Sequence, residues 1–186
     1  MVLLTLGLGL WAAMHLLPST APGLRQGVID KLGFNAYRGM FSLSVLAALA
    51  LIVFGWRSSQ PSSVYLPAES LRPVALLLMV LAFLCLGASG RATRIARLIR
   101  HPQLTGLLIW SISHLLSNGD SRSLILFGGM GLWAALEMVL ISRREGDWQK
   151  PQAPSWTKEV LGVAITLGVM AVVMLIHPWI AGVPIF

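Results

Sequence analysis

Six long apolar runs, separated by short polar connections, are the feature that most limits what this chain can fold into. Apolar runs of this length in such a series are typical of polytopic membrane proteins. We therefore predict an all-α, polytopic integral membrane helix bundle with about six transmembrane helices. The predicted spans are residues 2–17, 40–56, 73–89, 104–117, 124–141 and 160–176.

Composition points to the same class of protein. Only 11% of the residues are charged and 56% are hydrophobic, with a mean hydropathy of +0.77. A soluble domain of this size carries about a quarter charged residues. No polar stretch is long enough to build a second core, so the sequence predicts a single domain over residues 1–186.

The fourth predicted span is shorter than the others and covers only roughly 21 Å at 1.5 Å per residue. We expect it to pack against the fifth span as a helical hairpin, closed by the turn Asn118-Gly119-Asp120. The first span has no basic segment before it, as a signal peptide would have, and is therefore predicted to be a retained helix.

The basic residues gather at the ends of the apolar runs, where they meet lipid headgroups. This distribution accounts for the net charge of +7 and argues against nucleic-acid binding; the lipid bilayer is the expected partner. Arg57, Arg72 and Arg122 lie on one side, whereas the first, third and fifth connections carry the other eleven of the 14 Lys and Arg residues. Because cytoplasmic loops are rich in Lys and Arg, both termini are predicted to be periplasmic.

Arg91, Arg94, Arg97 and Arg100 recur every three residues, which predicts that they share one face of a helix. Such a helix could lie at the interface against anionic lipid, or it could bind a phosphate, pyrophosphate or porphyrin propionate. His101 is expected near the N-cap of the next helix, whose first turn suits Pro102.

The chain has four histidines, and none has another His, Cys or acid at metal-ligand spacing. Motifs for zinc hydrolysis, phosphate loops and serine nucleophiles are absent. Cys85 is expected to be a small buried apolar residue. His15 and His114, however, lie in different predicted helices, where two neutral imidazoles could act as axial ligands of a haem iron. The alternative for each is a hydrogen bond to a neighbouring helix.

The expected depths of His15 and His114 in the membrane make it difficult for both to bind one haem. Helix rise places His15 about 3–5 Å below the cytoplasmic surface and His114 roughly 15 Å deeper, so joint ligation needs a tilted macrocycle or displaced helices. His101, nearer in depth, remains the alternative second ligand. Glu137, the only acid well inside a span, is expected to bind a neighbouring helix or to relay a proton.

The sequence resembles the NnrU family of bacterial membrane proteins over nearly its whole length. The residues that carry the resemblance are His15-Leu16-Leu17-Pro18-Ser19, Leu24-Arg25, Gly33 through Tyr37-Arg38, Arg100-His101-Pro102-Gln103, Trp110, His114-Leu115-Leu116, Asn118-Gly119-Asp120 and Arg143-Arg144.

This resemblance implies a multi-pass protein of the bacterial inner membrane and a link to nitrite and nitric oxide reduction. Relatives of the family include the 15-cis-zeta-carotene isomerase, a membrane enzyme that uses haem b with histidine ligands. The resemblance therefore implies that His15 and His114 bind haem b, with Arg100 and His101 as further cofactor-binding candidates. A lipophilic polyene or another lipophilic small molecule is the implied substrate.

Arg100-His101-Pro102 followed by Gly106, Trp110 and Asn118 also resembles the corner where isoprenylcysteine carboxyl methyltransferases and phospholipid methyltransferases bind S-adenosylmethionine. The chain departs from that pattern at Leu104 and lacks the downstream Glu-Glu pair. Three functions therefore stay open: a haem-dependent isomerase or redox protein, a non-enzymatic accessory factor for membrane respiratory complexes that reduce nitrogen oxides, and a membrane methyltransferase.

Overall fold

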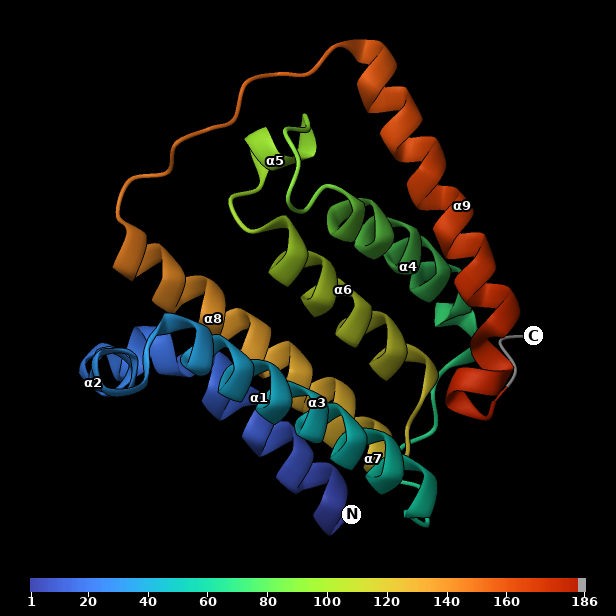
Figure 1. Ribbon diagram of the computed structural model, residues 1–186. Coiled ribbons are helices and arrows are strands. Elements are labelled where there is room, and N and C mark those ends of the chain that lie inside the picture. The colour runs from blue at the N-terminus through green and yellow to red at the C-terminus, as the bar shows by residue number, and fades with distance from the viewer. Residues whose placement is uncertain (184–186) are drawn as a thin grey trace.

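The computed structural model describes residues 1–183 and is an all-α membrane bundle, as predicted (Figure 1). Five of its helical segments are long and apolar enough to cross a membrane, and α6, with 16 residues, is a shorter sixth. The membrane helices in this range are α1 (Val2–Thr20), α3 (Phe34–Ser58), α4 (Arg72–Gly87), α6 (Pro102–Ser117), α8 (Gly129–Glu145) and α9 (Trp156–Ala181). Helix α8 continues from α7 (Ser121–Ser123) and the π-helix η2 (Leu124–Gly128).

The membrane helices pack as a row of neighbours rather than around one central axis. Helix α3 packs on α1, α1 on α8, α8 on α6, α6 on α4 and α4 on α9 (Figure 1). The ends of α1, α4 and α8 and the starts of α3, α6 and α9 lie on the same side, toward the upper left of Figure 1. The connections with most of the Lys and Arg residues therefore share one side of the bundle.

Helices α1 and α3 approach closely because glycines face the partner backbone. A Cβ on Gly7 would lie 2.8 Å from the backbone N of Ile52, and a Cβ on Gly55 would overlap the backbone of Leu4. Leu4 is fully buried at this contact. Small residues drive helix association in lipid because they allow the backbones to come into van der Waals contact.

The predicted hairpin of α6 and α8 is present, and a segment before α4 clamps its turn. The amides of Val64 and Tyr65 both donate to the carbonyl of Gly119, at 2.8 and 3.0 Å. The Tyr65 hydroxyl donates to the carbonyls of Leu115 and Asn118. These bonds satisfy backbone groups at the end of α6, which a membrane protein must pair near lipid.

The predicted arginine face is wrong, because α5 (Ile95–Leu98) is a single helical turn. Gly90 has a φ of +70°, a conformation that interrupts the helix before Arg91. The Arg94 guanidinium stacks at 3.7 Å from the centre of the Trp156 ring, while Arg91 bonds back to the carbonyl of Gly87. Arg91 and Arg94 therefore have separate partners, and the four arginines do not share the face of one helix.

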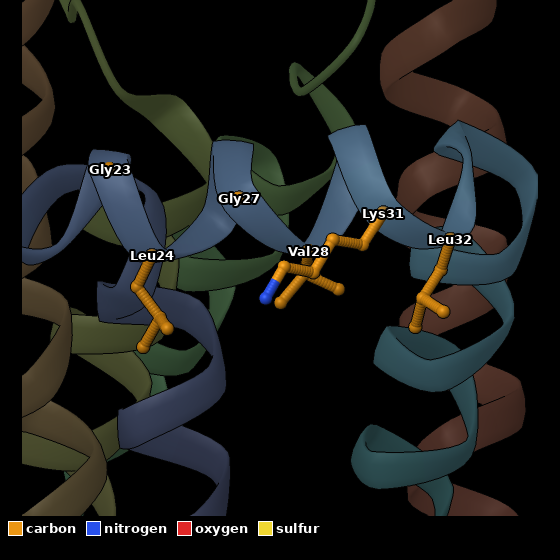
Figure 2. A pocket seen from close by; sticks show the side chains of 6 residues that line it. All are labelled: Gly23, Leu24, Gly27, Val28, Lys31 and Leu32. Atoms are coloured by element: carbon orange, nitrogen blue, oxygen red, sulfur yellow. The ribbon is translucent and has the colours of Figure 1, made fainter.

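Helix α2 (Pro22–Leu32) was not predicted, and it lies across the ends of α1 and α3 (Figure 2). Its side chains Leu24, Val28, Lys31 and Leu32 point toward the side along which α1 and α3 extend, and they line a shallow pocket of about 330 Å³. Leu24 and Leu32 are exposed there. An exposed apolar face beside membrane helices indicates that α2 rests in the bilayer interface. A short 3₁₀ turn, η1 (Glu69–Leu71), precedes α4.

We expect Gly55→Ala to destabilise the protein by about 1–3 kcal/mol, the usual penalty for overpacking a close contact. The added methyl group would overlap the backbone of Leu4. Thermal unfolding of the detergent-solubilised protein measures the loss. Gly9→Ala is the control, since no atom lies within 4 Å of its added Cβ. Equal melting temperatures for the two variants would contradict the glycine contact.

Candidate functional site

His15 lies in a group of aromatic rings that we call the His15 cluster: Trp11, His15, Phe41 and Trp133. The imidazole stacks on Trp11, with ring centres 4.2 Å apart, and meets the edges of Trp133 and Phe41 at 5.2 and 5.3 Å. Trp11 and His15 are one turn apart on α1, whereas Phe41 comes from α3 and Trp133 from α8. Three membrane helices therefore enclose the imidazole.

One hydrogen bond fixes the tautomer of His15. Its Nδ1 lies 2.8 Å from the carbonyl oxygen of Trp11. Because a carbonyl only accepts, Nδ1 must carry the proton, and Nε2 then presents a lone pair. Within residues 1–183 no hydrogen bond engages Nε2 of His15. This is the arrangement of a metal-binding histidine whose other nitrogen is held by a backbone carbonyl.

Buried polar atoms surround this cluster without partners. In the described part of the chain, Nε1 of Trp11, Nε1 of Trp133 and Oε2 of Glu137 are buried and make no hydrogen bond. Glu137 is only 6% exposed. Buried polar atoms in native proteins are nearly always paired, so these three atoms mark the region as a candidate binding site, while Arg94, Ser111 and Arg122 carry such atoms outside the His15 cluster.

The register of α1 and α8 places Glu137 level with His15. The two helices run in parallel, since Leu8 lies against Gly129, Trp11 contacts Trp133 at 5.6 Å and Arg144 donates to Ser19 at 2.8 Å. These contacts pair residues separated by a nearly constant number of positions. The same offset brings Glu137 of α8 to the height of His15 of α1.

His114 belongs to a different group, the His114 cluster: Trp56, Trp110, His114 and Phe127. Its ring stacks on Phe127 at 4.3 Å and leans on Trp110 at 4.7 Å. Its Nδ1 bonds the carbonyl of Trp110 at 3.0 Å, so Nε2 again holds the lone pair. Phe127 lies in the π-helix η2, a distortion that often marks functional sites.

The two histidines that the sequence singled out are therefore not brought together. His15 lies toward the α2 side of the bundle, and His114 lies one turn before the end of α6, on the side of the turn Asn118-Gly119-Asp120. No ring contact or hydrogen bond joins the two clusters' histidines in the described residues. Their joint ligation of one haem stays a prediction from the family resemblance.

His101 and Arg100 lie at the start of α6, where His101 is the predicted N-cap residue and Pro102 opens the helix. Nε2 of His101 is hydrogen-bonded to Oγ of Ser142 at 2.8 Å. Arg100 lies 4.0 Å from the carboxylate of Glu145. Burial lowers the pKa of His101 and the Arg100 charge lowers it further, while Glu145 acts in the opposite direction.

A repeated local motif underlies both clusters and could have been found in the sequence. Trp11 precedes His15 by four residues, and Trp110 precedes His114 by four. On a helix this spacing stacks the two rings and lets Nδ1 reach the tryptophan carbonyl. Within residues 1–183, no group of three or more His, Cys, Asp or Glu residues could hold a metal ion by itself.

Comparison of the sequence with family models identifies the family of the chain. Residues 3–185 match the model of the family described as NnrU protein. The chain belongs to the NnrU family. No curated protein and no solved structure matches this NnrU chain. The family that the sequence resembles is thus confirmed, and the paired aromatic and histidine clusters are features of this NnrU chain itself.

We expect the NnrU protein to lose thermal stability as the pH falls from about 7.5 to about 5.5, in part through His101. Because the folded pKa of His101 is lowered, the unfolded chain binds the proton more tightly, and protonation favours unfolding. His101→Gln should therefore reduce the pH dependence of the melting temperature. His177→Gln, on α9 and away from Arg100 and Glu145, serves as the control. Identical slopes for wild type and His101→Gln would contradict the assignment.

Proposed function

We propose that this NnrU protein binds haem b at the His15 cluster, where Nε2 of His15 would hold the iron. The observation that carries the proposal is the fixed tautomer of His15: its Nδ1 is held by the Trp11 carbonyl, and its Nε2 makes no hydrogen bond within residues 1–183. A carbonyl bond at Nδ1 orients the ring and raises the basicity of the ligating nitrogen.

The surroundings of His15 fit a porphyrin in chemical character. Trp11, Phe41 and Trp133 supply flat apolar faces from three helices. The unpaired Nε1 atoms of Trp11 and Trp133 can donate to a polar group of a bound molecule. Glu137, at the height of His15, can hold or move a proton inside the membrane.

Only one protein ligand is favoured by this arrangement. His114 has the same tautomer but lies toward the opposite end of the bundle, and Nε2 of His101 is engaged by Ser142. Haem held by His15 would supply redox chemistry or activation of a polyene double bond. The residues of the chain bind and orient the group and exclude water from it.

The setting we propose is the bacterial inner membrane, with the basic connections in the cytoplasm and both termini in the periplasm. The unequal distribution of Lys and Arg between the two sides supports this orientation. The proposed activity is haem-dependent chemistry on a small or lipophilic molecule, either nitrogen-oxide reduction or isomerisation of a polyene. The family resemblance supports both settings.

Absorption spectra of the purified protein, oxidised and dithionite-reduced, test the proposal. We expect a Soret band with reduced α and β bands, and we expect His15→Ala to lose most of it, because the axial ligand is removed. His114→Ala should retain the band, since His114 lies in the other cluster. His177→Ala is the control for loss of an imidazole outside the His15 cluster, because its Nδ1 bonds Val183 at the end of α9.

Two outcomes would contradict the proposal in different ways. A protein that stays colourless after haem addition would remove haem and favour the accessory role, which predicts co-purification with a respiratory complex. A Soret band that survives in His15→Ala but disappears in His114→Ala would move the ligand to the His114 cluster. Saturable binding of S-adenosylmethionine by the colourless protein would instead favour the methyltransferase.

A further inference from the structure

A second site, which we call the arginine pocket, opens at the ends of α1, α2, α3 and α8. It has a volume of about 500 Å³. Arg25 of α2, Arg38 of α3 and Arg144 of α8 contribute its charge. Phe34, Tyr37 and Phe41 contribute apolar walls. The pocket thus joins residues that are far apart in the sequence, and it combines a cationic part with an aromatic part.

No carboxylate lines the arginine pocket. In residues 1–183, neither Arg25 nor Arg38 forms an ion pair, and Arg144 has only Glu145, at 3.4 Å, as its acidic partner. Three guanidinium groups that face one hollow with so little compensating charge repel one another. An anion inside the pocket would relieve this repulsion.

Ring faces and a hydroxyl hold the three guanidinium groups in place. Arg25 lies over the Tyr37 ring, with its Cζ 5.1 Å from the ring centre, and Arg38 lies over Phe34 at 5.8 Å. Arg144 donates to the Ser19 hydroxyl at 2.8 Å. Stacking uses the flat face of a guanidinium and leaves its N–H edge available for the paired oxygens of a phosphate.

The position of the pocket in the bilayer indicates where the anion comes from. Arg25 lies on α2, whose exposed apolar side chains point toward the side along which the membrane helices α1 and α3 extend (Figure 2), as expected of a helix in the bilayer interface. Phosphate groups of lipids lie at the same level. Along α3, Leu46 and Leu49 are exposed one and two turns beyond the lining residue Ser42. A lipid whose head fills the pocket could therefore run its acyl chain along α3.

We propose that the arginine pocket binds the phosphate of an anionic phospholipid. Arg25 and Arg38 supply charge-assisted hydrogen bonds, Arg144 completes the cationic wall, and Phe34 and Phe41 contact the glycerol and upper acyl region. Lipid binding can be measured on the protein whether or not it carries haem, so the lipid site can be tested even if the haem proposal fails.

Native mass spectrometry of the full-length protein in detergent, titrated with phosphatidylglycerol or with phosphatidylcholine, tests the site. We expect phosphatidylglycerol to bind more tightly, and the double variant Arg25→Ala/Arg38→Ala to weaken it by about tenfold or more. The control is Arg97→Ala/Lys150→Ala, which removes the same charge from exposed positions outside the pocket. Should the alanine pair not fold, Arg25→Gln/Arg38→Gln removes both charges and keeps side-chain bulk.

Several results would overturn the lipid site. Equal losses in the pocket and control variants would show a general effect of surface charge. Equal affinity for the two lipids would remove the requirement for an anionic head. Displacement of the lipid by inorganic phosphate at similar concentration would make the pocket a site for a free anion. Unchanged lipid binding with a weakened Soret band in the arginine variants would assign the pocket to the carboxylates of a porphyrin.

Discussion

Apolar side chains gain little by leaving lipid for protein, so helices in a bilayer are held by close packing and by paired polar groups. The contact of α1 with α3 depends on this constraint, because Gly7 and Gly55 let the two backbones touch. Where the side chains between helices are large, stacked aromatic rings provide the close packing, as in the two clusters around His15 and His114. The buried Nε1 atoms of Trp11 and Trp133 and Oε2 of Glu137 have no partner among the described residues, which is why this region is the candidate site.

The series of long apolar runs predicted the main helices, because a chain built of such runs has few alternatives to a membrane bundle. The turn after α6 and the N-cap at His101 followed from local turn and cap chemistry. Helix α2 escaped prediction because its apolar positions are few and two glycines interrupt them. The arginine face failed because regular spacing implies a shared face only where the backbone is helical, and Gly90 interrupts it.

For the candidate site, the sequence pointed to the histidines but not to their environments. His15 and His114 stood out because imidazoles are rare inside membrane helices. Their partners Phe41, Trp133 and Phe127 come from other helices, and no local pattern connects them. The arginine pocket was hidden for the same reason. The Trp-x-x-x-His spacing was visible in the printed sequence. Of the site's features, it is the one that could have predicted the Nδ1-protonated tautomers of His15 and His114.

The parallel contact of α1 with α8 also has a consequence for biosynthesis. Trp11 lies on α1 and is made before Trp133 on α8, with the membrane helices α3, α4 and α6 made between them. During that interval His15 has no ring from α8 beside it, and its α1 face is open to lipid or to insertion factors. The three-helix environment of His15 is therefore complete only after the fifth membrane helix, α8, has entered the bilayer.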